Sequence, residues 1–280
     1  MHAIDFCGEF GSVYNMSHCD GLVMLRTDTK VYIINPATGD VLKLPDGQKD
    51  ALRFETVGLG LDPRSNKYKV ARSFYRSVNF SKQTYDAGME VFTIGGGESC
   101  WREIDDPPYP IQLQTVMYFK GSFYWHICKK LLGRHPQGFL RFNLEDETFS
   151  FIWCPVLPSE EDQLDFVELH DELCLAQYLP RQIVIWMSPS GNSHVWNQHY
   201  IIELSEALRF KPLGMFNDGI LVRSDNYLYR YDQESRNARE VVRVDQLRYK
   251  NPRVGSFDFV GEDLFFFNII PYTESLVPLT

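Results

Sequence analysis

The fold can be predicted from the pattern in residues 115–153, which read TVMYFKGSFYWHICKKLLGRHPQGFLRFNLEDETFSFIW. Short runs of aromatic, aliphatic and β-branched residues follow one another at Thr115–Phe119, Ser122–Ile127, Phe139–Leu144 and Thr148–Trp153. Lys120-Gly121 and Glu145-Asp146-Glu147 supply tight bends between runs. The stretch therefore predicts four antiparallel strands that follow one another as a meander.

The same grouping recurs along the chain. Comparable sets of apolar runs, separated by Gly, Pro, Asn, Asp and Ser, occupy residues 12–44, 56–104, 165–203 and 211–244. Three further runs finish the chain, at Phe257–Val260, Asp263–Phe267 and Ser275–Leu279. Four-stranded groups that recur about every 45 residues are typical of propeller blades.

This recurrence predicts an all-β protein, a β-propeller of four-stranded antiparallel blades. A β-sandwich would hold fewer strands, and two sandwiches would need a linker that the sequence does not show. Division of 280 residues by about 45 gives six blades, and about 21 strands divided by four give five to six. We favour six blades and leave five open. Residues 12–16 and 255–279 are expected to close the ring with N- and C-terminal strands, which removes exposed sheet edges.

The charge balance limits the classes of partner. The chain carries 28 Lys and Arg against 37 Asp and Glu, a formal net charge of −9. Because nucleic acid and anionic membranes attract basic proteins, we expect no membrane partner and rank nucleic-acid binding last. The first ten residues lack the basic start and apolar run of a signal peptide, which predicts a cytoplasmic or nuclear protein.

No motif with a defined catalytic or metal-binding mechanism occurs in the sequence. G-x-S-x-G, H-E-x-x-H and C-x-x-C are absent, and the 6 cysteines and 7 histidines are scattered. We therefore expect no catalytic residue, cofactor or metal. Acidic turns at Asp105-Asp106, Glu145–Glu147 and Glu160–Asp162 leave one alternative, a propeller enzyme or carbohydrate-binding protein with carboxylates near a central channel.

Several segments resemble, in order, the motifs of the F-box-associated domain of plant F-box proteins, a β-rich, kelch-like module. Ser17–Val23 resembles the family's S-C-N-G-L element with an inserted His. Asn35–Thr38, followed by Leu44-Pro45, resembles its N-P-x-T hairpin that ends in L-P. Gly58–Pro63 with Tyr68–Val70 is similar to its G-x-G-x-D and Y-K-V pair. The resemblance extends over nearly the whole chain.

In that family the domain follows an F-box, a helical segment that binds a Skp-type adaptor of an SCF-type ubiquitin ligase. We expect no F-box within residues 1–280, which we interpret as a single F-box-associated domain. Only Leu157–Glu161 imitates the L-P-x-E-[LI] start of an F-box, and Glu161 stands where an apolar residue is required. The resemblance therefore implies adaptor binding only if an F-box lies upstream.

Long basic connections predict a partner-binding surface. If the strands of each blade are named A to D, the B-to-C connections of a propeller emerge on one face. Here they are the longest and most basic connections, and long loops on a rigid scaffold often carry binding groups. Arg and Tyr are also enriched among residues that dominate interface energies. The candidate partner-binding residues are Arg76, Lys82, Tyr85, Lys129, Lys130, Arg134, His135 and Arg181.

Two interpretations of these connections stay open. Their Lys and Arg residues could simply keep surface loops solvated. The favoured hypothesis is a non-catalytic protein-interaction module that resembles the substrate-recognition domain of a plant SCF-type E3 ubiquitin ligase F-box protein. Such a module would bind a target protein with an acidic surface through the loops of one propeller face.

Overall fold

The structure is a computed structural model of the 280-residue chain. It describes residues 12–52, 55–97, 99–113, 116–132, 136–156, 163–188, 195–203, 210–246, 248–250, 257–259, 269–270 and 272–279, with 248–250 and 257–259 described by their backbone alone. The chain divides into two compact units, unit 1 (Met1–Cys154 with Tyr272–Thr280) and unit 2 (Pro155–Pro271). A single domain over residues 1–280 stays a prediction.

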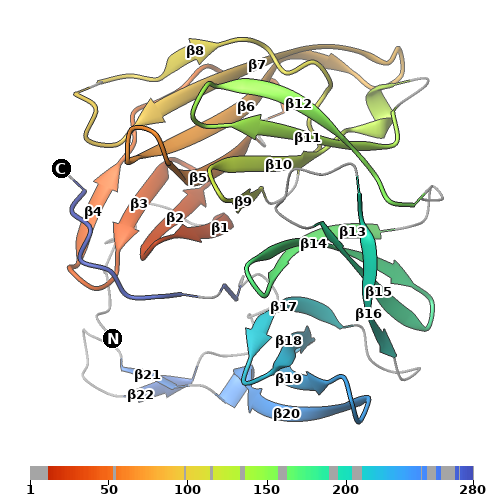
Figure 1. The fold of residues 1–280 in the computed structure, drawn as a ribbon. Helices are drawn as coiled ribbons and strands as arrows, with labels where there is room; N and C mark the ends of the chain where they lie inside the picture. The colour runs from red at the N-terminus through yellow and green to blue at the C-terminus, as the bar shows by residue number, and fades with distance from the viewer. Residues whose placement is uncertain are drawn as a thin grey trace. The chain divides into compact units, whose positions relative to one another are not determined.

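Unit 1 contains three four-stranded antiparallel sheets, each with its strands in sequence order (Figure 1). The first sheet consists of β1 (Val13–Cys19), β2 (Leu22–Thr27), β3 (Val31–Asn35) and β4 (Asp40–Lys43). The second consists of β5 (Thr56–Asp62), β6 (Lys67–Asn79), β7 (Thr84–Thr93) and β8 (Arg102–Ile104). The third consists of β9 (Met117–Phe119), β10 (Ser122–His126), β11 (Gly138–Asn143) and β12 (Thr148–Trp153).

Unit 2 contains two further sheets of the same kind. The fourth sheet consists of β13 (Gln163–Leu169), β14 (Glu172–Leu179), β15 (Gln182–Ser188) and β16 (Asn197–Glu203). The fifth consists of β17 (Lys211–Phe216), β18 (Gly219–Ser224), β19 (Tyr227–Asp232) and β20 (Asn237–Arg243). The all-β prediction of four-stranded antiparallel blades is confirmed. The described residues form five blades, the number that the sequence left open beside the favoured six.

Tight turns explain why the predicted strands fold back where they do. Lys120 and Gly121, between β9 and β10, both have positive φ angles of +42° and +75°. His170 and Asp171, between β13 and β14, repeat this conformation with +53° and +57°. Two consecutive residues with positive φ match the twist of antiparallel strands, and such turns favour Gly, Asn and Asp. The local sequence therefore sets the register of the β9–β10 and β13–β14 hairpins.

Apolar residues fill the space between neighbouring blades within each unit. The second blade is therefore packed on both faces, which explains the nearly continuous apolar runs of its central strands. Residues of neighbouring blades that share one core cluster include Met24 with Leu59 and Val91 with Trp125 in unit 1, and Ile185 with Val222 in unit 2. Each unit thus has its own core.

The C-terminal segment returns to the first blade, although not as a strand. Asn35 Nδ2, at the end of β3, donates hydrogen bonds to the carbonyl oxygens of Ser275 at 3.0 Å and Val277 at 2.8 Å. Leu279 joins the core cluster of the first two blades. Gly21 has a φ of +85°, and an added Cβ would lie 2.3 Å from the Ser275 Cβ. Side-chain hydrogen bonds and apolar packing, rather than a sheet ladder, therefore hold the C-terminal segment on the first blade.

The sixth predicted group of strands does not form a blade in the described residues. β21 (Arg248–Lys250) and β22 (Phe257–Phe259) form only a two-stranded ladder. Residues Asp263–Phe267 lie outside the described part of the chain, and Ser275–Leu279 holds no strand. Pro278 lacks the amide hydrogen that a ladder needs. This explains why the terminal segment packs without extending a sheet.

Candidate interaction surface

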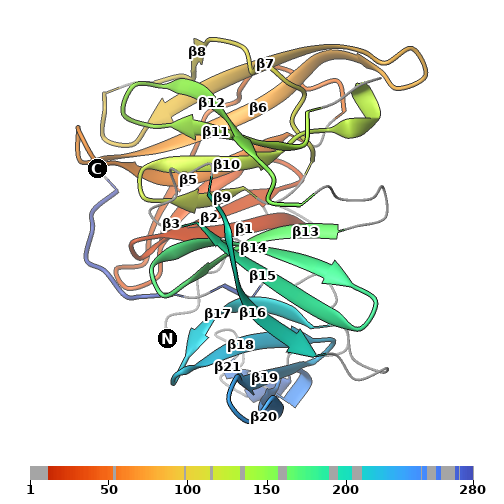
Figure 2. The same ribbon diagram turned by 45° about the vertical axis from the view of Figure 1, so that its right-hand side comes forward.

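The sequence predicts a loop at residues 76–88, and the structure shows a hairpin arm there instead. β6 continues to Asn79, and β7 begins at Thr84. β5 accompanies β6 only to Ser73, and β8 pairs with β7 only from Met89 onward. Residues 74–88, which we call the arm, therefore extend past the edge strands of their blade (Figure 2). The β6–β7 ladder continues through the arm as far as the Asn79–Thr84 pair, with one register shift between Tyr75 and Ser77.

One face of the arm packs onto the rest of unit 1. Val78 and Tyr85 are cross-strand partners, and both pack against a cluster that contains the buried Tyr75 and Leu131. Leu131 belongs to a short 3-10 helix, η1 (Lys129–Leu131), in the connection after β10. Because side chains alternate along a strand, the opposite face of the arm carries its polar residues. The β6–β7 and β10–β11 connections thus meet in one cluster.

Hydrogen bonds fix the base of the arm at Tyr75. Its backbone N–H donates to the Oδ1 of the buried Asp50 at 2.7 Å, and its carbonyl accepts from the Ala51 N–H at 2.7 Å. Its hydroxyl donates to the Ile111 carbonyl at 2.7 Å. Burial raises the pKa of this hydroxyl, so it remains a hydrogen-bond donor. The segment between the first two blades therefore covers one edge of the arm at its base.

Arg76, a predicted partner-binding residue, is engaged by three carboxylates. Its guanidinium lies 3.0 Å from Asp86 and 3.1 Å from Asp106, and it also pairs with Glu103. It donates a further hydrogen bond to the Ala87 carbonyl at 2.8 Å. The hydrogen bonds to Asp106 and Glu103 raise the pKa of Arg76 above its ordinary value. Arg76 therefore ties β6 to β7 and to the segment that follows β8.

Four other predicted residues gather around the arm. Lys82 is exposed in the turn at its tip, and Tyr85 lies half-buried on its packed face. Lys129 and Lys130 lie on η1, whose Leu131 packs against the arm. Within the part of the chain that the structure describes, no ion pair joins any of these three lysines to a carboxylate. The structure therefore brings residues of two separate connections together at one site.

The structure does not place the other three predicted residues at this site. Arg181 is exposed in the turn between β14 and β15, which belongs to unit 2. The two strands leave only Pro180 and Arg181 outside them, so this connection is short. Arg134 and His135 lie outside the described residues. Partner binding by all eight predicted residues stays a prediction.

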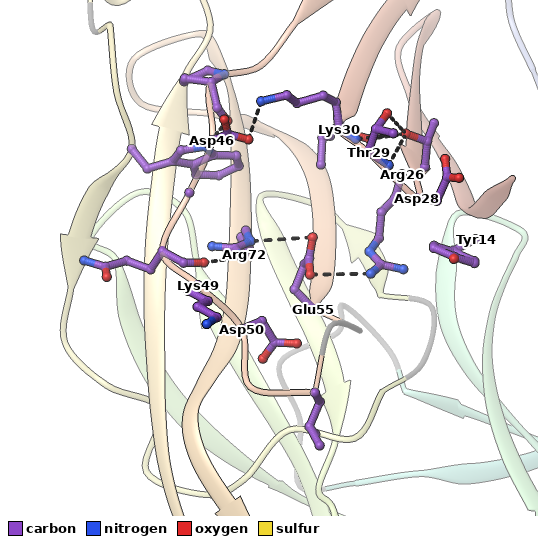
Figure 3. Close-up of a pocket in the computed structure, with 17 residues that line it drawn as sticks. Tyr14, Arg26, Asp28, Thr29, Lys30, Asp46, Lys49, Asp50, Glu55 and Arg72 are labelled. Atoms are coloured by element: carbon purple, nitrogen blue, oxygen red, sulfur yellow. Dashed lines mark hydrogen bonds and ion pairs between the residues drawn. The ribbon is translucent and has the colours of Figure 1, made fainter. Parts of the chain in front are cut away.

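A pocket of about 510 Å³ lies next to the base of the arm (Figure 3). It is formed by the β2–β3 turn, by the segment that links the first two blades, and by side chains of the second blade. The charged residues that line it are Arg26, Lys30, Lys49, Arg72, Asp28, Asp46, Asp50 and Glu55. Four basic and four acidic residues balance one another. The pocket is therefore polar without a dominant charge.

Glu55 lies between two nearly buried arginines in this pocket (Figure 3). Its carboxylate is 3.4 Å from Arg26 Nη2 and 3.9 Å from Arg72 Nε. Arg72 also pairs with Glu90 and donates to the Gln48 carbonyl at 2.6 Å. Charges this deep are stable only when paired and hydrogen-bonded. These contacts therefore hold the linking segment against the second blade.

The linking segment is fitted closely to its surroundings. The Gln48 N–H donates to Glu90 Oε1 at 3.2 Å, and Trp101 Nε1 donates to the Pro45 carbonyl at 2.9 Å. At Gly47, an added Cβ would lie 2.0 Å from Glu90 Oε1, so any side chain would displace the ion pair. The sequence carries no local signal of this pocket, because its walls come from segments far apart in the chain.

The acidic turns considered for catalysis are largely engaged in ion pairs. Glu145 lies 2.6 Å from Arg64, and Glu147 accepts hydrogen bonds from Lys69 at 3.0 Å and Arg102 at 2.8 Å. Burial opposes the shift, but these hydrogen bonds lower the pKa of Glu147. Residues 160–162 lie outside the described residues. Within those described, no group of three or more His, Cys, Asp or Glu is placed to hold a metal ion.

Comparison with known proteins gives the family context of this surface. The family model described as the F-box associated beta propeller domain matches residues 2–257. An F-box/LRR-repeat protein of Arabidopsis thaliana is 24% identical over 93% of this chain and 61% of its own length. An F-box protein of Arabidopsis thaliana is 25% identical over 81% of this chain and 53% of its own length. The chain thus spans little more than half the length of these relatives.

Two further findings concern the chain as a whole. Among solved structures it is similar to KlAtg21 in the complex with the coiled-coil of AgAtg16. The TM-score is 0.48, with 12% identity over 82% of this chain and 69% of that chain. The described residues include no helix with the length and apolar character required to cross a bilayer.

Proposed function

This chain belongs to the F-box associated beta propeller domain family, and from this premise we propose that it is the target-recognition module of an F-box protein. The module binds a target protein without catalysing a reaction on it. An F-box elsewhere in the polypeptide would bind a Skp-type adaptor and so present the target to an SCF-type ubiquitin ligase. This role places the protein in the cytoplasm or the nucleus, where such ligases act.

The observation that carries the proposal is the arm and its neighbour η1. Binding groups concentrate on connections that a rigid scaffold holds in place. Here the arm is held by hydrogen bonds at Tyr75, by the carboxylates around Arg76 and by packing against Leu131. Its exposed tip and η1 carry three lysines that no carboxylate neutralises among the described residues. Such a surface favours a target with acidic residues.

The predicted binding residues support the proposal unequally. Lys82, Lys129 and Lys130 have the exposure or the unpaired charge that recognition needs. Arg76 and Tyr85 have structural contacts of their own, so they support the shape of the surface. The enzyme or carbohydrate-binding alternative rests on acidic turns, and the carboxylates described there are largely occupied by basic partners. Target binding is therefore the function that the geometry supports best.

The proposal can be tested by joining recognition to degradation. Residues 1–280 are expressed in plant cells alone, behind a known F-box, and behind the same F-box altered so that it no longer binds the adaptor. Proteins that copurify with residues 1–280 alone are identified, and their half-lives are measured in cells that express each of the three forms. We expect at least one retained protein to be degraded faster only with the intact F-box.

Two outcomes would refute the proposal. In the first, no protein retained by residues 1–280 changes its half-life with the intact F-box. In the second, purified residues 1–280 bind the Skp-type adaptor directly, which would assign adaptor binding to the propeller. Neither outcome depends on the arm, so both test the function rather than the surface.

A further inference from the structure

The tip of the arm presents an aromatic side chain to solvent. Phe80 is the first residue after β6 and has an exposed fraction of 46%. It is absent from the cluster in which Val78 and Tyr85 pack, although it lies only a few residues away. A Phe side chain left this far in water gives up part of the favourable free energy that burial of its ring would supply. An exposed aromatic ring at the end of the arm is the kind of side chain that anchors a protein interface.

The turn that carries Phe80 is preorganised. Asn79 Oδ1 accepts a hydrogen bond from the Lys82 N–H at 2.9 Å, and the Gln83 N–H approaches the Phe80 carbonyl at 3.4 Å. Gln83 closes the turn with a φ of +51°. A side chain on a loop that is already ordered loses less conformational freedom when it binds. The turn thus holds Phe80 ready for contact.

The charged residues of the tip (residues 79–83) and of η1 are all lysines. Lys82 shares the turn with Phe80, and Lys129 and Lys130 lie on the helix packed against the arm. The nearest acid on the arm is Asp86, and Arg76 pairs with it. The tip and η1 together therefore carry one exposed aromatic ring and three lysines that have no carboxylate partner in the described part of the chain.

We propose that Phe80 anchors the target protein by inserting into an apolar pocket whose rim carries Asp or Glu residues. Burial of the ring supplies affinity, and the lysines select the acidic rim and speed association. This inference rests on the proposed function, because it names the partner surface that the arm recognises. The proposal thus gives Phe80 a role in choosing the target, although the basic charge of the loops does not point to this residue.

The test replaces Phe80 and compares a matched exposed aromatic. Phe216, at the end of β17 in unit 2, has an exposed fraction of 39%. For a protein that wild-type residues 1–280 retain and that an attached F-box destabilises, F80A should weaken binding by at least about 30-fold. F216A should leave binding unchanged, and F80L should restore most of it. Urea unfolding midpoints of all variants should match the wild type, because both rings are exposed.

A photoreactive probe then identifies the partner surface. Benzoylphenylalanine replaces Phe80, and cross-linked peptides are mapped by mass spectrometry. We expect cross-links to apolar residues of the target that have Asp or Glu around them. The triple variant K82Q/K129Q/K130Q should slow association and flatten its dependence on salt.

Several results would overturn this inference. Equal binding by F80A and wild type would leave the proposed function in place and remove the role of Phe80. Cross-links to a second copy of this chain would assign the tip to self-association. Phe80-dependent sedimentation with phosphatidylserine vesicles, without target cross-links, would assign it to membranes. If wild-type residues 1–280 retain no target at all, the proposed function fails first.

Discussion

Replacement of Asn35 tests how the C-terminal segment is held on the first blade. The buried Asn35 side chain makes two kinds of hydrogen bond. Its Nδ2 donates to the Ser275 and Val277 carbonyls, while its Oδ1 accepts from the Ala37 N–H at 2.9 Å. A buried hydrogen bond contributes about 0.5–1.5 kcal/mol. Asn35→Ala should therefore lower the free energy of unfolding by about 2–4 kcal/mol.

A truncation separates the two contributions. Removal of residues 274–280 deletes both carbonyls, worth about 2 kcal/mol, and also the buried Leu279, worth about 1.5–3 kcal/mol, so it should cost about 3.5–5 kcal/mol by itself. In the truncated chain, Asn35→Ala can lose only the bonds within the turn, which Asn35 Oδ1 accepts from the Ala37 and Thr38 N–H groups. The two changes should then be non-additive by about 2 kcal/mol, the worth of two hydrogen bonds.

Urea unfolding followed by tryptophan fluorescence measures each corner of this cycle. Asn35→Asp is the matched control, because it keeps the acceptor for Ala37 but replaces the donor with a charge that faces two carbonyl oxygens. It should be at least as harmful as Asn35→Ala in the full chain and nearly silent in the truncated one. Strict additivity of Asn35→Ala and the truncation would falsify the idea that the Asn35 side chain holds the C-terminal segment.

Three further changes test other contacts. Arg76→Gln should cost at most about 1 kcal/mol, because its ion pairs are partly exposed, and should therefore raise amide hydrogen exchange at residues 84–88 by up to about fivefold. Unchanged exchange would contradict its role in the arm. Gly47→Ala should cost about 1–3 kcal/mol in urea unfolding, since its Cβ would meet Glu90, and a neutral result would be inconsistent with that packing. Burial, with a smaller effect of a nearby lysine, lowers the pKa of His126 from 6.5 to about 4. Between pH 4 and 6.5 the unfolded chain thus binds more protons at this histidine than the folded chain does. The free energy of unfolding should therefore be highest above pH 6.5 and fall by on the order of 3 kcal/mol as the pH drops toward 4. His126→Asn should remove this pH dependence, as measured by urea unfolding across that range.

The strands were predictable because local chemistry determines them. Residues 115–153 alternate between apolar runs and turn residues, and the structure places all four strands of the third blade there. The Lys120-Gly121 bend forms the expected tight turn with positive φ at both positions. Blade number was less certain, because it depends on the terminal runs. The segment at Ser275–Leu279 has strand-like composition but is held by a side chain from elsewhere.

The arm and the pocket could not be predicted in the same way. Residues 76–88 are polar enough to suggest a loop, yet a ladder survives there because Val78 and Tyr85 find a packing partner in Leu131. That partner is distant in sequence. The pocket depends on Glu55 lying between Arg26 and Arg72, an arrangement that only the tertiary fold creates. The spacing of residues within a single segment of the sequence therefore could not have predicted either contact.

The basic residues of unit 1 divide by chemistry in a way that bears on recognition. Arg72 and Arg76 each engage two or more acidic side chains, as suits a planar guanidinium with several donors. Lys82 and Lys130 lie on exposed connections without a carboxylate partner among the described residues. A paired arginine must lose its partners before it can bind a target, whereas an unpaired lysine sheds only water. If the proposed function holds, a target should therefore gain most from contact with Lys82, Lys130 and Phe80.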